Sequence, residues 1–325
     1  DGWSVDFKKQ NGRNPWHGHP FNKHNNINGV DGDVTGKGTG LDFHTLGVPE
    51  KILDLQKAYI RKTIDAVNDL DNVLYEITNE SAGSSTEWQY EMIRYIKWYE
   101  ENHKEKKHPV MMTYQYPDGN NEDLINSPAD AISPGNSDAE APSFLDSIWN
   151  FSPDDLNGKK VILLDTDHIG GYWGDRNWAW KCFLRGINPI YMDYIDIERP
   201  VLPYYQLDDS KVEEICDNME KEIRLAMGDT LRFARKIDLT SMLPRRELSS
   251  TQYCLANEGL EYLFYQPESG PFSASLNAGD YTMEWFDTIN RREWTGHKMS
   301  SDGKNTRFVP PSDSPCVLYV KRIIK

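Results

Sequence analysis

The stretch NVLYEITNE, residues 72–80, decides how this sequence is interpreted. It opens with a short, mostly apolar run bounded by polar residues, which predicts a buried strand. The strand delivers an Asn-Glu pair, Asn79 and Glu80, at its carboxyl end. In α/β barrels this end of the strands carries the active site, and a buried glutamate there can act as a general acid. The alternative is that Asn79 and Glu80 only cap the helix that follows.

Helices and strands alternate on both sides of this stretch. Residues 49–70 carry apolar side chains at helical spacing, and a second helix with an apolar face follows Glu80. Apolar runs then predict further strands at residues 109–114, 131–133, 161–164 and 188–192. Such alternation is typical of a parallel α/β sheet or barrel. The residues before the first helix are rich in Gly, Asn, His and Asp and predict a long, ordered loop, which is often functional.

The end of the chain has a different pattern. From Tyr253 onward, short strand candidates are separated by turns with the sequences NAGD at 277–280 and SDGK at 301–304. This pattern predicts a small antiparallel β-sandwich, with Trp285 and Phe286 in or near its core. We therefore expect two domains, a (β/α) barrel over residues 1–243 and a β-sandwich over residues 244–325.

The composition argues against two classes of partner. Lys and Arg total 36 and Asp and Glu total 51, so the net charge of −15 would repel a nucleic acid. No uninterrupted apolar run approaches the ~20 residues of a membrane-spanning helix, so no membrane partner is expected. The 38% of hydrophobic residues suffice for a sizeable core. Four cysteines form no C-x-x-C motif, and buried thiols are their favoured interpretation.

Residues 72–80 resemble the acid/base strand of clan A glycoside hydrolases, in which Asn-Glu closes the fourth strand of a (β/α)8 barrel. These enzymes place a second carboxylate at the end of the seventh strand. Three strands further on, this sequence has KKVILLDTDH at residues 159–168. The stretch from Tyr253 to Lys325 resembles the small β-sandwich that follows such barrels in some bacterial families, one of which is named for collagen binding.

The resemblance implies a glycoside hydrolase that cleaves a plant or microbial glycan with two carboxylates. Glu80 would be the acid/base, and Asn79 would position a sugar hydroxyl. The nucleophile or base would be Asp165 or Asp167, which a spacing of two places on one face of the strand. The clan normally has Glu at this place. Because Asp is shorter, the gap to Glu80, and with it the choice between retention and inversion, stays open.

Further side chains are expected to bind the substrate, an oligosaccharide or polysaccharide. They lie in the long first loop and at or after the ends of later strands: His17, His19, Tyr114, Gln115, His168, Trp173 and Asp193. No cofactor is expected, because two carboxylates suffice for this chemistry. No metal is expected either, although the histidines of the first loop are candidate zinc ligands and its Asp and Asn residues candidate calcium ligands. A secreted or periplasmic location in a bacterium follows from the resemblance alone.

This numbering of the strands leaves the barrel incomplete. If residues 72–78 form strand four, only a polar loop and one helix precede it, so strands one to three are missing. The segment WSV at residues 3–5 is at most the frayed end of strand three. The open edge then needs a cover: the loop, the sandwich, or a second copy in a homo-oligomer. An incomplete barrel keeps two alternatives open, a non-catalytic carbohydrate-binding protein and a matrix- or collagen-binding module.

Overall fold

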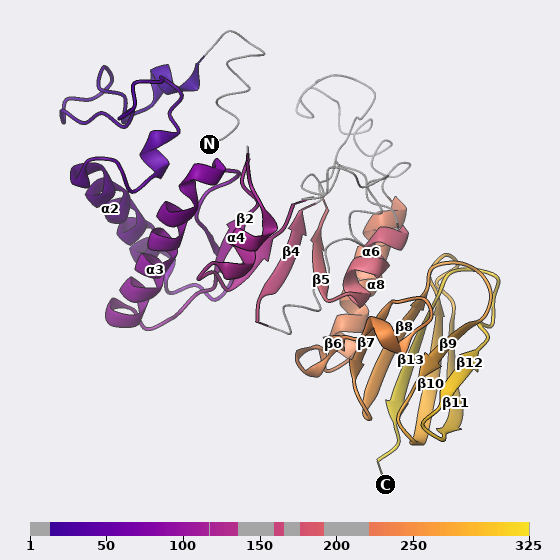
Figure 1. Ribbon diagram of the computed structural model, residues 1–325. Helices are drawn as coiled ribbons and strands as arrows, with labels where there is room; N and C mark the ends of the chain where they lie inside the picture. Colours follow the sequence, from indigo (N-terminus) through magenta and orange to yellow (C-terminus); the bar gives the residue numbers. More distant parts are fainter. Residues whose placement is uncertain (1–13, 117, 136–158, 166–175, 192–220, 325) are drawn as a thin grey trace, which may run out of the picture. The chain divides into compact units, whose positions relative to one another are not determined.

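The computed structural model describes residues 14–116, 118–135, 159–165, 176–191 and 221–324 (Figure 1). The chain divides into two compact units, and the division falls inside one strand, after Leu163. The first unit comprises residues 1–139 and 159–163, and the second comprises residues 140–158 and 164–325. The predicted domain boundary between residues 243 and 244 stays a prediction.

Parallel strands form the sheet that the alternating pattern predicts. They are β1 (Tyr75–Glu76), β2 (Val110–Thr113), β3 (Ala131–Ser133), β4 (Val161–Asp165) and β5 (Ile187–Ile190), and their order in the sheet is the order in the chain. The pairs β1–β2, β2–β3 and β3–β4 are parallel. Every residue of β2 and β3 is buried, as expected for parallel strands covered on both faces. The α/β class is thereby confirmed.

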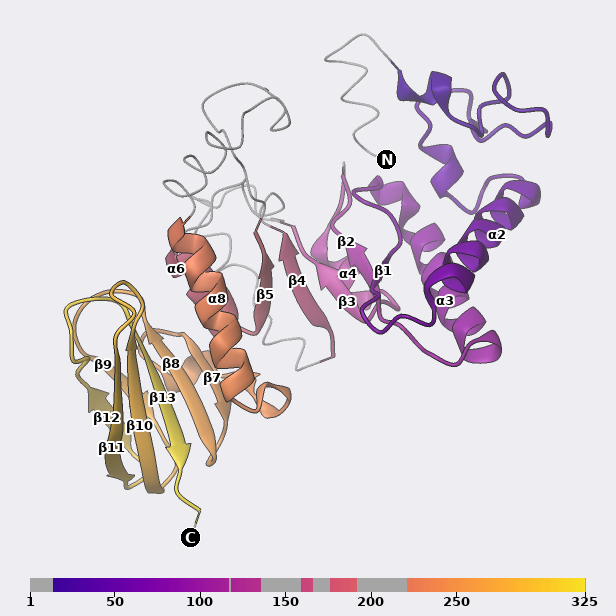
Figure 2. The ribbon, with the colours of Figure 1, turned by 180° about the vertical axis from the view of Figure 1, so that it is seen from behind.

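Helices precede and follow β1 in the first unit, where α2 and α3 lie side by side (Figures 1 and 2). They are α2 (Glu50–Val67), α3 (Thr86–His103), α4 (Asn121–Asn126) and the 3-10 helices η1 (Pro15–Gly18), η2 (Asp42–His44) and η3 (Gly83–Ser85). Over the described residues 14–49 the long first loop has a defined backbone that includes η1 and η2. It has a small core of its own, formed by Trp16, Val30, Phe43, Val48 and Ile52. Residues 14–74 are all described and contain no strand, but this does not establish that the barrel is incomplete.

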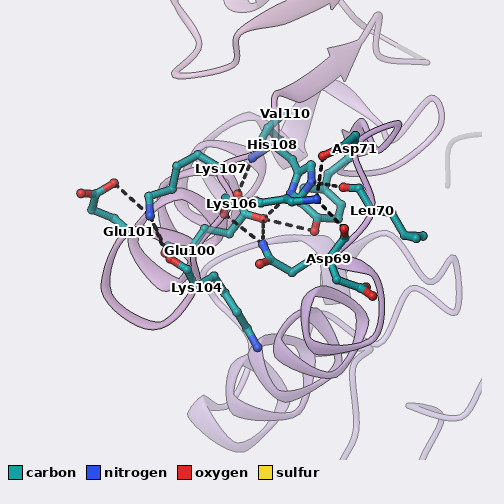
Figure 3. A network of polar contacts seen from close by, with 12 residues as sticks. Asp69, Leu70, Asp71, Glu100, Glu101, Lys104, Lys106, Lys107, His108 and Val110 are labelled. Carbon is teal, nitrogen blue, oxygen red and sulfur yellow. Dashed lines mark hydrogen bonds and ion pairs between the residues drawn. The ribbon is translucent and has the colours of Figure 1, made fainter.

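A buried polar network fixes the ends of α2 and α3 to the start of β2 (Figure 3). Glu100 on α3 accepts hydrogen bonds from Asn68 Nδ2 (3.0 Å), Tyr75 Oη (3.2 Å) and the His108 backbone N–H (2.8 Å). The His108 ring lies between the Glu100 carboxylate and the Leu70 carbonyl, 2.8 Å from each. Since Tyr75 belongs to β1, this network helps to fix the strand that leads to Glu80.

Antiparallel strands dominate the second unit, as the sequence predicts. They are β6 (Leu243–Pro244), β7 (Cys254–Asn257), β8 (Glu261–Gln266), β9 (Phe272–Ser275), β10 (Gly279–Asp287), β11 (Glu293–Ser301), β12 (Asn305–Phe308) and β13 (Cys316–Arg322). One sheet has the order β11-β10-β13-β8-β7-β6 and the other pairs β12 with β9. The core residues between them come from both sheets, and Trp285 is one of them, as predicted.

The next residue of β10 points to the opposite face. Phe286 contacts Trp180 and Phe233, with ring centroids 6.0 and 5.6 Å apart. These two residues belong to α6 (Arg176–Leu184) and α8 (Lys221–Lys236), so both helices pack on the outer face of the six-stranded sheet (Figure 2). The alternation of side chains along a strand explains why adjacent residues serve two different interfaces.

The described cysteines are buried, as the sequence predicts. Cys182, Cys254 and Cys316 are buried free thiols, and Cys216 lies outside the described residues. Within the described part of the chain, no helix has both the length and the apolar composition needed to cross a membrane.

Candidate active site

The carboxyl end of β1 brings Asn79 and Glu80 to the edge of the sheet where β2 also ends. Tyr75 N–H donates to the Pro109 carbonyl (3.1 Å) and Ile77 N–H to the Met111 carbonyl (3.4 Å), so parallel pairing continues up to Ile77. Asn79 and Glu80 follow within three residues. Asn79 is exposed, whereas Glu80 is only 8% exposed.

Glu80 has an unusual backbone for a residue that is not glycine. Its φ is +47°, in the left-handed region, which costs an L-residue about 1–2 kcal/mol. The helix-capping alternative does not hold, because α3 begins at Thr86 and its N-cap residue is Ser85. A buried carboxyl side chain on a strained backbone is an arrangement often found at functional sites.

A chain of hydrogen bonds surrounds the Asn79-Glu80 pair. The Ser81 hydroxyl is hydrogen-bonded to Thr78 Oγ1 (3.0 Å) and to His44 Nδ1 (2.9 Å). Thr113 Oγ1 on β2 lies 3.1 Å from both the Thr78 carbonyl and Glu76 Oε1, and it donates its single proton to these acceptors. The residues on either side of Asn79 and Glu80 are therefore tied to each other, to β2 and to η2.

His44 is a site residue that sequence reasoning missed. Its ring stacks on Trp88 with centroids 4.3 Å apart and contacts Phe43 at 3.9 Å. Burial lowers the pKa of His44 to about 3, so the imidazole is neutral. Since 37 residues separate His44 from Ser81 and no motif includes both, the sequence carries no signal for their contact.

Tyr114 and Gln115 follow β2 at the same edge of the sheet, as predicted. The Tyr114 hydroxyl donates to the Gly119 carbonyl (2.8 Å), and its ring packs on Gly135, where an added Cβ would approach within 2.3 Å. Gln115 is 1% exposed and donates to Thr86 Oγ1 at 2.8 Å. Its Oε1 has no hydrogen-bond partner among the described residues. Both side chains brace the loops at this edge, and their roles in substrate binding stay predictions.

The predicted histidines of the first loop lie in two environments. His17 is exposed on η1. His19 stacks between Trp16 and Phe43, with centroids 5.1 and 4.3 Å away, and burial lowers its pKa. Its Nδ1 accepts the Phe21 N–H (3.1 Å), so this nitrogen carries no proton. Within the described residues, no group of three His, Cys, Asp or Glu side chains is placed to hold a metal.

A cavity of about 910 Å³ lies in the first unit beside β1. Its walls are mostly apolar and come from the first loop, α2, β1 and α3; they include Phe21, Phe43, Ile60, Ile77, Trp88 and Met92. His19, His44 and Glu76 supply polar groups. β1 is the edge strand of its sheet, and one of its edges has no partner among the described strands. The cavity lies beside this strand.

The second carboxylate falls largely outside the described residues. β4 is present over Val161–Asp165, which places Asp165 as the last residue of a strand, as predicted. Asp167, His168, Trp173 and Asp193 lie outside the described residues. Their roles, and the separation of the two carboxyl groups, stay predictions.

Comparison with known proteins identifies a class of fold. No protein-family model matches the chain, and no curated protein sequence matches it either. Among solved structures, it is similar to a protein described as a glycoside hydrolase, with a TM-score of 0.58 and 12% identity over 84% of this chain and 70% of the other. A glycoside hydrolase family 5 protein from Bacteroides vulgatus gives a TM-score of 0.54 and 12% identity over 83% and 67%.

These similarities concern the fold alone. Which reaction the protein catalyses must be argued from the side chains of its site. The fold is similar to that of these two glycoside hydrolases, which is in line with the resemblance of residues 72–80. At 12% identity the similarity does not identify catalytic residues. Since no family model matches, the resemblance of residues 253–325 to the family named for collagen binding is not confirmed.

Proposed function

We propose that this protein is a glycoside hydrolase that cleaves a plant or microbial oligosaccharide or polysaccharide, with Glu80 as its acid/base. The observation that carries the proposal is the placement of Glu80. It is a buried carboxylic acid, held at positive φ immediately after a parallel strand, in a fold similar to glycoside hydrolases. A secreted or periplasmic location remains part of the proposal, because polysaccharides are met outside the cell.

The proposed reaction needs two carboxylates and no cofactor. Glu80 would protonate the glycosidic oxygen as the bond to the leaving group breaks. Asn79, exposed beside it, would hydrogen-bond a sugar hydroxyl. Asp165 or Asp167 would either activate a water that attacks the sugar, or attack the sugar itself to form a glycosyl ester. Water, activated by the deprotonated Glu80, would then hydrolyse that ester. A carboxyl separation of about 5–5.5 Å would give retention, and one of about 6.5–9.5 Å would give inversion.

The test is hydrolysis of a panel of aryl glycosides and polysaccharides by wild-type protein and three isosteric variants. Glu80→Gln should remove activity on polysaccharides and on aryl glycosides with poor leaving groups, while the far-UV spectrum and melting temperature stay unchanged. Asp165→Asn and Asp167→Asn identify the second carboxylate, because only one of these variants should lose as much activity as Glu80→Gln. Glu87→Gln is the matched control, since Glu87 is an exposed carboxylate seven residues later, in the first turn of α3. Full activity of Glu80→Gln would refute the assignment.

A non-catalytic carbohydrate-binding protein is the second candidate. The observation in its favour is the cavity of about 910 Å³ beside the edge strand β1, which fits an incomplete barrel. Titration calorimetry with the same glycan panel separates the two. Binding without hydrolysis, unaffected by Glu80→Gln, would favour the second candidate.

A further inference from the structure

A strained backbone needs a restraint, and Glu80 has one on each side. Without support, a residue at φ +47° would relax toward negative φ, because such conformations persist only where the surroundings impose them. Thr78 is fixed from β2, whose Thr113 hydroxyl lies 3.1 Å from the Thr78 carbonyl. Ser81 is 1% exposed, and its hydroxyl closes the loop back to Thr78 Oγ1 at 3.0 Å.

We propose that His44, acting through Ser81, is a positioning residue that holds Glu80 in the geometry required for proton donation. This inference rests on the proposed function, because it assigns Glu80 the acid role. The contact that carries it is the hydrogen bond of 2.9 Å between His44 Nδ1 and the hydroxyl of Ser81, the residue next to Glu80.

His44 has the properties that such a role requires. Its ring is held between Phe43 and Trp88, at 3.9 and 4.3 Å, and the Trp88 indole is in turn fixed by a hydrogen bond to Gln56 Oε1 (3.0 Å). Being neutral, the ring adds no positive charge near a carboxyl group that must carry a proton. A rigid, uncharged anchor is therefore attached to the residue that follows Glu80.

Loss of this anchor should affect proton donation more than substrate binding. With the Ser81 hydroxyl removed, the Asn79-Glu80 segment can relax, and the carboxyl group moves away from the glycosidic oxygen. A misplacement of about 1 Å lowers a rate by up to about 100-fold. Leaving groups that depart as stable anions need no proton, so their release should be nearly unchanged.

The first test compares Ser81→Ala and His44→Phe on aryl glycosides with good and poor leaving groups. We expect kcat to fall about 10- to 100-fold for poor leaving groups, with KM little changed, and less than about 3-fold for a dinitrophenyl leaving group. His44→Asn, which can place an amide near the position of Nδ1, should restore most of the loss. Ser84→Ala is the matched control, because Ser84 is an exposed hydroxyl three residues later, in η3.

The outcomes separate this inference from the proposed function. Equal losses with both leaving groups in Ser81→Ala and His44→Phe would overturn the positioning role, whereas Glu80→Gln would still report on the acid. If Glu80→Gln shows no preference between leaving groups, the proposed function fails, and the positioning role in proton donation fails with it.

A second test needs no activity. At positive φ, Glu80→Gly should melt about 2–4 °C above Glu80→Ala, because glycine tolerates this conformation. If His44 and Ser81 impose the conformation, this difference should vanish or reverse when both variants also carry Ser81→Ala. A difference that persists unchanged would show that Ser81 does not hold the backbone.

Discussion

His108, two residues before β2, is expected to make the stability of the first unit depend on pH. Both ring nitrogens of His108 face acceptors, Glu100 Oε1 and the Leu70 carbonyl, at 2.8 Å each. The hydrogen bond to Glu100 is the main cause that raises the pKa of His108 above its usual value of 6.5. The ring is thus expected to be an imidazolium that donates from both nitrogens.

The direction of the pH dependence follows from linkage. Because the pKa of His108 is raised on folding, its stabilising contribution is complete below about pH 6.5 and is lost as the pH rises through the folded-state pKa. We expect the free energy of unfolding to fall over that range in the wild type, and this fall to disappear in His108→Gln. Urea denaturation between pH 5 and 9 measures it, with the exposed His103→Gln as control. An identical fall in His108→Gln would assign the effect to another group.

At the level of residues, the sequence predicts a functional side chain only where a local pattern, such as the end of an apolar strand, marks its position. Asn79 and Glu80 could be predicted because they end an apolar strand, and the structure places them at the edge of the sheet. His44 and Ser81 could not, since their contact joins residues 37 apart in the chain. The same limit applies to Asn68 and Glu100, which are 32 residues apart.

At the level of elements, β10 shows how one strand serves two interfaces. Phe286 is 2% exposed and packs on Trp180 and Phe233, so its removal should separate α6 and α8 from the sheet. We expect Phe286→Ala to lower the free energy of unfolding of the second unit by about 3–5 kcal/mol. Urea denaturation measures this loss, and Ile289→Ala, at a side chain 47% exposed, is the control. A loss below about 1 kcal/mol would contradict this packing role.

The strands differ in how well the sequence predicts them. β2 is predictable because a parallel strand covered on both faces reads as an apolar run, and all of its residues are buried. β4 is also predictable from its apolar run, although Val161 is 52% exposed. β11 cannot be recognised from its sequence, EWTGHKMSS, which is mostly polar and exposed; antiparallel pairing with β10 holds it at the edge of its sheet. β1 covers only Tyr75–Glu76 and is shorter than the predicted strand over residues 72–78, although the Ile77 N–H still donates to the Met111 carbonyl.

At the level of the whole molecule, the edge of β1 predicts self-association. Leu55 and Tyr59 line the cavity of about 910 Å³ and are 38% and 75% exposed, so apolar surface is accessible beside an edge strand. If a second copy covers this surface, sedimentation velocity should show a dimer that Tyr59→Glu converts to monomer. Leu260→Glu, at an exposed side chain of the second unit, should leave the dimer intact. A wild-type monomer at all accessible concentrations would make this prediction wrong.

The central claim is that Glu80 donates the proton to the leaving group, and the rate of Glu80→Gln as a function of leaving-group pKa tests it most directly. The substituted amide has the same shape as the carboxyl group but no acidic proton to donate. The account predicts a loss of about 100-fold or more in kcat for poor leaving groups, and a loss that shrinks steadily as the leaving group improves. A variant that cleaves poor leaving groups at the wild-type rate would contradict the account and move the acid to another residue.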